Sequence, residues 1–468
     1  MTKQMFIVTA VILMLFLAAC GNVNVAEPGE AGEAIAAVEA GDYTENYIEG
    51  RTSEEEAQDE YAAGDDAANL ERALNWVQDL EQFRDFFPTR HINAFSVITE
   101  DEFNYLVDEL IAAVSYLDDV QVITRLRRIF SAIGDSHSNI GGLGTANIDY
   151  PMNLRLPLFL HIFDDGLYVV NATEKYKDVI HAKVAAIGGH DVDYVLRQVR
   201  TIVPSENDYW AKARMPVFIM RHIYLYGLGI LPDMDYAHFT VVKDGEVTEI
   251  IIEAIDTPHN EIVWYNLFRE NCIVARNYEL FYHFEFLEDY GALILNYNLC
   301  RDIIGGPAFA AFNHRMFEYV ADKELRKIIV DLRVNTGGNA EIFNSFTNEL
   351  RQRADEFKDV EIYVLVGRDT YSAAMFAISG ILNAAPYAVT VGERIGGALQ
   401  RYGNIDVFRL SNTDISVSFS RDFWDFTASP LSNDLGVNAF IPEIEIPFTI
   451  DDFIAGRDPV LDYVLGRG

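Results

Sequence analysis

The chain has 468 residues, of which half are apolar or aromatic and 23% are charged. This predicts about two to three globular domains with buried cores and excludes a wholly disordered chain. The 72 acidic residues exceed the 36 basic ones, for a net charge of −36, which argues against nucleic-acid binding and against electrostatic docking on anionic lipid. The sequence has no zinc-type spacing of cysteine and histidine, so we expect no metal and no cofactor.

The first 20 residues have the features of a secretory signal. Lys3 is their only charge, and an apolar run too short for a comfortable membrane span extends from Met5 to Ala19. The run ends in Leu17-Ala18-Ala19-Cys20-Gly21, which resembles the bacterial lipobox. That resemblance implies cleavage before Cys20 and a diacylglycerol on its sulfur, and hence a lipid-anchored protein on the extracytoplasmic face of the cell membrane. The alternative is a plain signal peptide whose cysteine is accidental.

An acidic segment separates this signal from the first periodic helix. Residues 21–66 hold 14 acids and a single base, Arg51, and such a composition is typical of a solvated, disordered tether. The sequence therefore predicts five parts: a signal at 1–20, a tether at 21–69, a helical unit at 70–145, a mixed β/α domain at 146–265 and a catalytic domain at 266–468.

The helical unit contains three predicted helices. Apolar residues recur every three or four positions from Leu70 to Phe83, which indicates the first helix. Thr99 followed by Glu102 is typical of a capped start for the second. The third runs from about Val120 to Ile133.

The middle domain shows two hairpin signals and one strand-to-helix unit. Asp164-Asp165-Gly166 and Lys243-Asp244-Gly245 each stand between two apolar, strand-like runs. A strand at 183–189 leads into a helix from about Asp191.

Strands and helices alternate through the last third of the chain, which argues for βα units and a mainly parallel sheet. The predicted strands are Ala292–Tyr297, Ile328–Leu332, Ile362–Val366 and Ala388–Val391, and the predicted helices are Phe309–Lys323, Ala340–Arg353 and Ala373–Asn383. In such sheets, functional residues lie on the loops that follow the strands.

Three polar loops could carry chemistry. Gly337 and Gly338 follow a buried strand, and their N–H groups could bind an oxyanion, although a sharp turn explains them equally well. Ser372 stands at a strand-to-helix turn, as a nucleophile or as a helix N-cap. His137 lies among small polar residues at a helix end, which suits a general base.

Together these loops resemble the tail-specific, C-terminal-processing proteases, serine peptidase family forty-one, and most closely the branch of the tricorn protease core. The matching motifs are Gly134–Ser138, Asp331–Gly338, Thr370–Ala374, Gly392–Gly397 and the tail Gly456–Leu461. The resemblance implies an α/β fold with a ClpP/crotonase-like core. It also implies a serine endopeptidase that hydrolyses peptide bonds in a peptide or protein substrate, which it binds near the substrate's C-terminus.

The family has two catalytic arrangements. One uses a lysine about 25 residues after the serine, but Gly392–Leu399 contains none, and Arg394 cannot replace it because a guanidinium stays protonated. The other uses a histidine base, which implies Ser372 as nucleophile and His137 as base.

In that histidine arrangement an adjacent serine, Ser136 here, and a distant carboxylate orient the imidazole. Asp434 is the candidate carboxylate, although the family usually has Glu there. The oxyanion donors carried over from the family are the amides of Gly338 (or Gly337) and Ala373.

Three questions stay open at the level of sequence. Residues 183–189 and Tyr226–Ile230 resemble parts of a peptide-binding PDZ module but occur in the wrong order, which favours a different β domain. The family also implies an alternative function, a non-catalytic peptide- or ligand-binding lipoprotein on the same fold. Cys272 and Cys300 could pair or stay free thiols.

Overall fold

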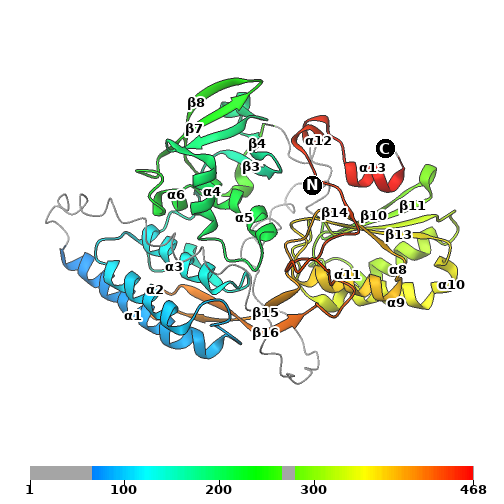
Figure 1. Cartoon of the computed structure of the whole chain (residues 1–468), viewed down its shortest axis with the longest axis horizontal. Coiled ribbons are helices and arrows are strands. Elements are labelled where there is room, and N and C mark those ends of the chain that lie inside the picture. Colours follow the sequence, from blue (N-terminus) through cyan, green and yellow to red (C-terminus); the bar gives the residue numbers. More distant parts are fainter. Residues whose placement is uncertain (1–65, 266–279, 467–468) are drawn as a thin grey trace, which may run out of the picture.

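The computed structural model describes residues 66–265 and 280–466. A helical unit, a middle domain with an antiparallel sheet and a core with a mainly parallel sheet follow one another along the chain. In Figure 1 the helical unit lies at the lower left, the middle domain above it and the core at the right. The predicted signal, Cys20, most of the tether and Cys272 lie outside the described residues.

The three helices of the helical unit are confirmed as α1 (Asp66–Arg90), α2 (Glu100–Ala113) and α3 (Asp119–Ile133). Thr99 and Glu102 form a reciprocal capping box at the start of α2, in which each side chain accepts from the other's backbone N–H. α3 ends at Gly134, whose φ of 75° lets the chain turn in left-handed backbone. The loop that carries His137 begins at this turn.

The middle domain is an antiparallel sheet in the order β3-β4-β5-β7-β8, with β6 beside β5. Both predicted hairpins are confirmed, with β3 pairing β4 and β7 pairing β8. Its strands are β2 (Leu154–Arg155), β3 (Leu158–Phe163), β4 (Gly166–Ala172), β5 (Lys183–Ile187), β6 (His190–Asp191), β7 (Tyr236–Lys243), β8 (Glu246–Glu253) and β9 (Ile255–Asp256). Its helices are α4 (Val192–Arg200), α5 (Asp208–Met220) and α6 (Ile223–Gly227).

The segment that resembles a carboxylate-binding loop does not form an open loop here. Tyr226 and Gly227 end α6, and Gly227 lies so close to Thr124 of α3 that a Cβ would overlap its side chain. The PDZ-like assignment therefore stays a prediction.

The core sheet has the order β10-β11-β12-β13-β14-β17, antiparallel between β10 and β11 and parallel from β11 onward. The predicted strands are confirmed to within one residue at each end. Its strands are β10 (Tyr282–Leu287), β11 (Ala292–Tyr297), β12 (Lys327–Asp331), β13 (Glu361–Val366), β14 (Val389–Gly392) and β17 (Ile444–Glu445).

Helices cover both faces of the core sheet. These helices are α8 (Phe309–Val320), α9 (Asn344–Gln352), α10 (Ala354–Phe357), α11 (Ala373–Ala384) and α13 (Pro459–Leu465), whereas α12 (Ile450–Ala455) packs against the middle domain. Alternate strand residues pack on the two sides, because side chains of a strand point to opposite faces: Leu295 and Val330 pack with α8, α9 and α11, whereas Ile294 and Ile329 pack with α13.

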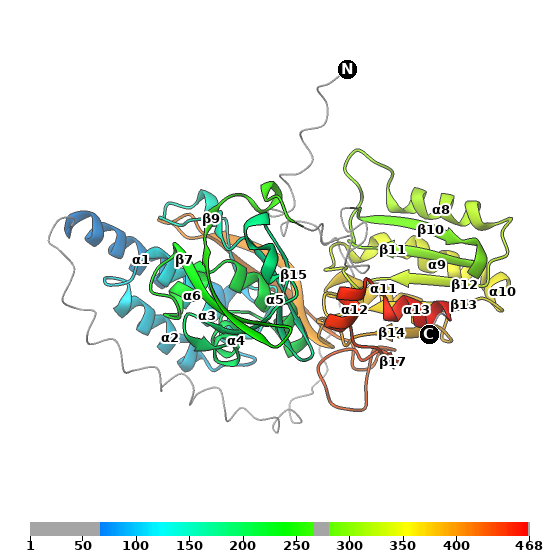
Figure 2. The ribbon, with the colours of Figure 1, turned by 90° about the horizontal axis from the view of Figure 1, so that it is seen from above.

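A long hairpin that sequence reasoning missed links the core to the helical unit. β15 (Gln400–Arg409) and β16 (Ser416–Asp425) extend from the core toward α1, and β16 pairs with β1 (Asn139–Gly141) directly after the His137 loop. Figure 1 shows this hairpin below α3, and Figure 2 shows it from above. The hairpin belongs to the predicted catalytic domain in sequence, but it pairs with a strand of the predicted helical unit.

Buried Asp79 of α1 holds the tip of this hairpin. Its carboxylate accepts from the backbone N–H of Asn412 at 2.9 Å and of Thr413 at 2.8 Å, and from both of their side chains. The hairpin thereby fixes the helical unit to the core.

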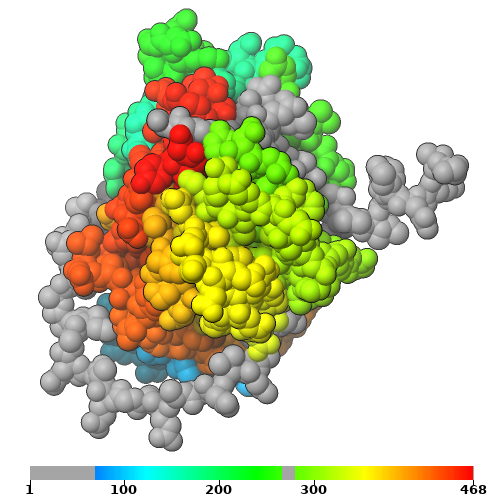
Figure 3. Space-filling model, turned by 90° about the vertical axis from the view of Figure 1, so that its right-hand side faces the viewer, coloured from blue at the N-terminus to red at the C-terminus, as the bar shows by residue number. Residues whose placement is uncertain are grey.

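The C-terminal segment joins the core to the middle domain. In Figure 3 it lies, in red, between the green middle domain and the yellow core. Phe448 and Phe453 pack with Phe163, Tyr168 and Val170 of the middle sheet. In the described ranges, no helix has the length and apolar character needed to span a membrane.

Candidate active site

Ser372 stands at a strained turn between β13 and α11. Its backbone has φ 55° and ψ −125°, a conformation rare for any residue but glycine. The strain is tolerated because the turn is held on both sides. Thr370 Oγ1 donates to Leu332 O at 2.8 Å, and Tyr371 N–H donates to Asn335 O at 3.0 Å. This is the local geometry of a nucleophile elbow.

The glycine loop after β12 lies directly against this turn. Gly337 has φ 104° and Gly338 has φ 131°, and a Cβ on Gly337 would overlap the Cβ of Ser372. The Gly337 N–H donates to Asn335 Oδ1 at 2.8 Å. In the described part of the chain, the N–H groups of Gly338 and Ala373 donate to no protein acceptor. Gly338 and Ala373 are therefore the better candidates for the predicted oxyanion donors.

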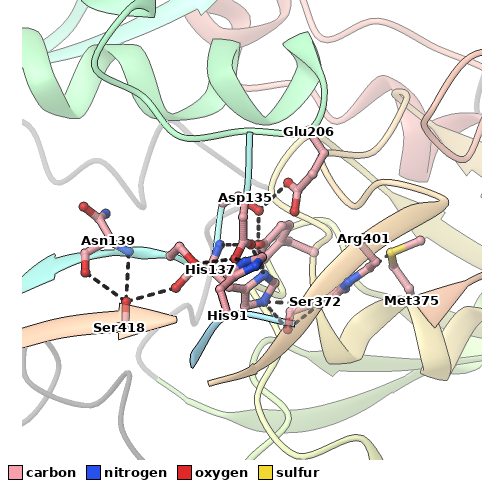
Figure 4. Close-up of polar contacts among 12 residues, drawn as sticks. His91, Asp135, His137, Asn139, Glu206, Ser372, Met375, Arg401 and Ser418 are labelled. Carbon is pink, nitrogen blue, oxygen red and sulfur yellow. Dashed lines mark hydrogen bonds and ion pairs between the residues drawn. The ribbon is translucent and has the colours of Figure 1, made fainter. Parts of the chain in front are cut away.

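The loop after α3 places His137 against Ser372. Its Nε2 lies 3.1 Å from Ser372 Oγ. Asp135 Oδ1 accepts from the backbone N–H of His137 at 2.9 Å, and His91 Nε2 and Ser138 Oγ contact Asp135 Oδ2 at 3.0 and 2.5 Å. Figure 4 shows the side chains of His91, Asp135, His137 and Ser372 gathered together.

The other ring nitrogen of His137 faces a chain of hydroxyl groups. Its Nδ1 lies 2.5 Å from the phenolic oxygen of Tyr371. That oxygen contacts Ser136 Oγ, and Ser136 Oγ donates to Glu206 Oε2. Trp210 of α5 stacks on the Tyr371 ring with centroids 3.9 Å apart, which fixes the ring.

Glu206 comes from the middle domain, just before α5. The next residue, Asn207, caps α5 and donates from Nδ2 to Gly396 O at 3.1 Å and to Asn438 O at 3.0 Å. These two bonds fix Glu206 to the core. The site is thus assembled from the helical unit, the middle domain and the core.

Burial and charge shift the pKa values of these groups. Burial first, and then the positive charge of Arg401, lower the pKa of His137 to about 3, against the opposing effect of Asp135. Burial first, and then the charge of Asp135, raise the pKa of Glu206 to about 7. Burial also works to raise the pKa of Asp135, but the hydrogen bond from His91 and the charge of His137 hold it at about 2.

Arg401 of β15 is a buried cation beside Ser372 and His137. Its Nη2 donates to Ser372 Oγ at 3.1 Å and lies 3.2 Å from His137 Nε2, and its Nη1 lies 3.5 Å from Met375 Sδ. Among the described residues it forms no ion pair, and its buried Nε has no hydrogen-bond partner. A positive charge in this position favours negative charge on Oγ or on a substrate oxygen.

The structure does not bring Asp434 to the imidazole. Asp434 is exposed in the loop before Gly436, and the groups that face Nδ1 are Tyr371 and, at 4.0 Å, the Asp135 carboxylate. Only its place before Gly436 in the family pattern points to Asp434. Glu206, reached through Ser136, is the carboxylate that the fold supplies instead.

Two other charged groups near the motifs have structural contacts. Arg394 pairs with Glu445 at 2.8 Å, away from Ser372. Arg333 pairs with Asp331 and with Asp458, which caps α13, so the Asp-x-Arg motif fastens the C-terminal helix.

Cys300 is a buried free thiol, and burial raises its pKa to about 12.

One group within the described ranges has the spacing to hold a metal ion. The facing atoms of Asp135, His137 and Glu206 lie within 4.8 Å of one another. The imidazole and both carboxylates already form hydrogen bonds there, to Tyr371, to His91 and to Ser136. We therefore assign these atoms to the hydrogen-bond network.

No sequence family and no curated protein matches the chain, but solved structures do. Mature CPAF complexed with lactacystin aligns with a TM-score of 0.55 and 12% identity over 84% of this chain and 97% of that one. A serine-to-alanine mutant of CPAF aligns with a TM-score of 0.58 and 12% identity, over 84% of this chain and 96% of that one. These are peptidases of family forty-one. The chain shares their fold. The photosystem II D1 C-terminal processing protease aligns with a TM-score of only 0.36 and 11% identity, over 80% of this chain and 93% of that one.

Sequence reasoning missed the residues that face His137 from other parts of the fold. Tyr371 stands beside Ser372 in the predicted turn, so its position was available although its role was not. Glu206 and Arg401 carry no local motif, because they reach the site through Asn207 and through the hairpin.

Proposed function

We propose that the protein is a serine endopeptidase with Ser372 as nucleophile and His137 as general base. One observation carries the proposal. The strained Ser372 turn puts Oγ 3.1 Å from His137 Nε2, beside two N–H groups that have no acceptor among the residues that the structure describes. A helix N-cap would not need this backbone, because an N-cap serine has extended backbone and bonds its own helix, which Ser372 does not do.

The reaction follows from these positions. Ser372 Oγ attacks the scissile carbonyl carbon while Nε2 takes the hydroxyl proton. The carbonyl oxygen becomes an oxyanion and accepts from the N–H groups of Gly338 and Ala373, each worth about 3–4 kcal/mol when well aimed. Nε2–H then protonates the leaving amine, and a water molecule hydrolyses the acyl-enzyme by the same steps in reverse.

Arg401 must change partners during this cycle. The single lone pair of Nε2 faces both Arg401 Nη2 and Ser372 Oγ, and only the serine proton can use it productively. As the oxyanion forms, its charge draws the guanidinium away from Nε2. Arg401 is therefore proposed as a catalytic residue that stabilises developing negative charge.

The anchor and the location belong to the same proposal. The lipobox-like Cys20 would hold the enzyme on the extracytoplasmic face of the cell membrane, where it would cleave peptide or protein substrates. Detergent-phase partitioning tests this part: wild-type protein should enter the detergent phase and Cys20→Ser should not. Equal partitioning of the two would exclude the anchor.

Labelling tests the nucleophile. A fluorophosphonate probe should label the full chain on the peptide that contains Ser372, and Ser372→Ala should abolish both labelling and peptide hydrolysis. Ser379→Ala is the matched control: Ser379 is a half-buried serine of α11 whose Oγ accepts from Asn383, and the variant should keep both. Hydrolysis that persists in Ser372→Ala would end the proposal and favour the non-catalytic reading of the site.

A further inference from the structure

Four polar groups form a continuous chain behind the reacting imidazole. They run from Glu206 Oε2 through Ser136 Oγ and the Tyr371 hydroxyl to His137 Nδ1. The helical unit supplies Ser136 and His137, the middle domain supplies Glu206 and the core supplies Tyr371. No single part of the fold contains all four groups, so this hydrogen-bonded chain exists only when the three parts are docked.

The chemistry of the groups fixes the direction of the hydrogen bonds when Glu206 is ionised. A carboxylate can only accept, so Ser136 donates to Glu206 and must accept from the Tyr371 hydroxyl. Tyr371 then accepts from Nδ1–H. This tautomer leaves Nε2 without a proton, and Nε2 can therefore take the proton of Ser372.

Proton uptake by Glu206 reverses the same chain. The buried Oε1 of Glu206 has no hydrogen-bond partner within the described residues, whereas Oε2 faces Ser136. A proton on Oε2 therefore has an acceptor, and one on Oε1 has none. With Oε2–H donating to Ser136, Ser136 donates to Tyr371 and Tyr371 donates to Nδ1. The imidazole proton then sits on Nε2, where it blocks general-base catalysis.

We propose that Glu206 is a positioning residue that selects the tautomer of His137 through Ser136 and Tyr371, so that proton uptake by Glu206 turns the base off. In this step the Nδ1 proton passes to Tyr371, the Tyr371 proton to Ser136 and the Ser136 proton to Glu206 Oε2, while one proton from solvent binds Nε2, so the charge of the site rises by one unit. No covalent bond between heavy atoms forms or breaks. The inference rests on the proposed function.

The charges around Glu206 place this switch near neutral pH. Besides Ser136 and Tyr371, the titratable and charged groups near it are Asp135, His137, Arg401 and the Tyr402 phenol. Burial and the charge of Asp135 raise the pKa of Glu206 to about 7, while the Ser136 hydrogen bond and Arg401 oppose the rise. The pKa of His137 is lowered to about 3, and that of Tyr371 lies well above its usual value because of burial. Neither of these two groups titrates near pH 7, so an acid limb there that Glu206→Gln removes reports Glu206.

The pH dependence of kcat/KM in the full chain tests the inference. Wild-type activity should fall about tenfold from pH 8 to pH 6, because a group of pKa near 7 is about nine-tenths ionised at the first pH and one-tenth at the second. Glu206→Gln cannot titrate and should vary by less than about twofold over this range, whatever its absolute rate. Tyr371→Phe keeps the ring stacked on Trp210 but breaks the relay. It should lose the same limb, with kcat lowered and KM little changed.

Controls separate the relay from other causes. Asp208→Asn changes the exposed acid two residues along and should keep the wild-type limb. Dialysis against EDTA should leave it unchanged. In protein labelled with ¹⁵N-histidine, the ring signals of His137 are identified by their loss in His137→Gln. Between pH 8 and pH 6 the proton of this ring should move from Nδ1 to Nε2 in the wild type, and it should not move in Glu206→Gln.

An unchanged limb in Glu206→Gln would overturn the inference, as would a pH-independent wild type or a limb that EDTA removes. Each of these results leaves the proposed function standing so long as Ser372 labelling and peptide hydrolysis are observed at pH 8. Loss of both in the wild type would instead overturn the proposed function.

Discussion

The proposed nucleophile and the proposed base of the candidate site are held by two different kinds of structure. Ser372, Tyr371 and the glycine loop belong to neighbouring βα units of one sheet, where short backbone bonds fix them. His137, Glu206 and Arg401 come from the helical unit, the middle domain and the hairpin. One half of the site forms when the core folds, and the other half needs three parts to dock.

The largest expected effect tests whether the two halves act as one unit. Ser372→Ala and His137→Ala should each lower kcat/KM by several orders of magnitude, about 10⁴-fold or more. The double variant should lose little beyond either, because nucleophile and base serve the same step. Steady-state peptide hydrolysis measures all three. Losses that multiply in the double variant would show that the halves act independently.

A second variant weakens the contact between the hairpin and the helical unit without changing a residue of the site. Asp79→Ala removes the carboxylate that accepts from Asn412 and Thr413 and leaves the buried donors of Thr413 without this acceptor, at a cost of about 2–4 kcal/mol. Urea unfolding should show this loss. kcat should also fall at least about tenfold, because the loosened hairpin no longer supports the loop of His137 through β1.

Asp85→Ala on the same helix is the control. Asp85 is exposed and its contact with Arg84 is 3.9 Å long, so both stability and kcat should stay near wild type. If Asp79→Ala kept full turnover, the hairpin would not be what positions the base.

The same division explains what the sequence could predict. Ser372, His137 and the glycines were found because each stands in a short motif after a strand or a helix, and the helices and strands of the core follow their apolar spacing. The 400–425 hairpin was missed, since its burial depends on α1 and β1, far away in sequence. Asp434 was chosen by its motif position, whereas Glu206 reaches His137 only through the anchor formed by Asn207.

A third prediction concerns the free energy of burying Glu206. Its folded pKa of about 7 lies above its ordinary 4.5, so the folded protein holds this proton more tightly than the unfolded chain does. The stability that comes from this proton is present in full below pH 4.5 and is lost as the pH rises through 7. Relative to wild type, Glu206→Gln should therefore gain about 2–3 kcal/mol in the free energy of unfolding between pH 5 and pH 8.

Urea titrations of both proteins at the two pH values measure this difference. Glu356→Gln, an exposed acid that pairs with Arg353 in α10, should show no comparable gain. An equal pH response of Glu206→Gln and wild type would mean that Glu206 is ionised in the folded protein at no cost, and the two halves would then dock without a charge penalty.

The smallest expected effect separates the two candidate carboxylates. Asp434→Ala should change kcat/KM by less than about twofold, because Asp434 is exposed and no contact joins it to His137, whereas Glu206→Ala removes the end of the hydroxyl chain and should lower kcat at least about tenfold. Peptide hydrolysis at pH 8, where Glu206 is ionised, gives the clearest contrast. A hundredfold loss of kcat in Asp434→Ala, with the Ser372 label retained, would mean that the 431–440 loop closes over the imidazole during catalysis, and the carboxylate of the base half would then have to be reassigned.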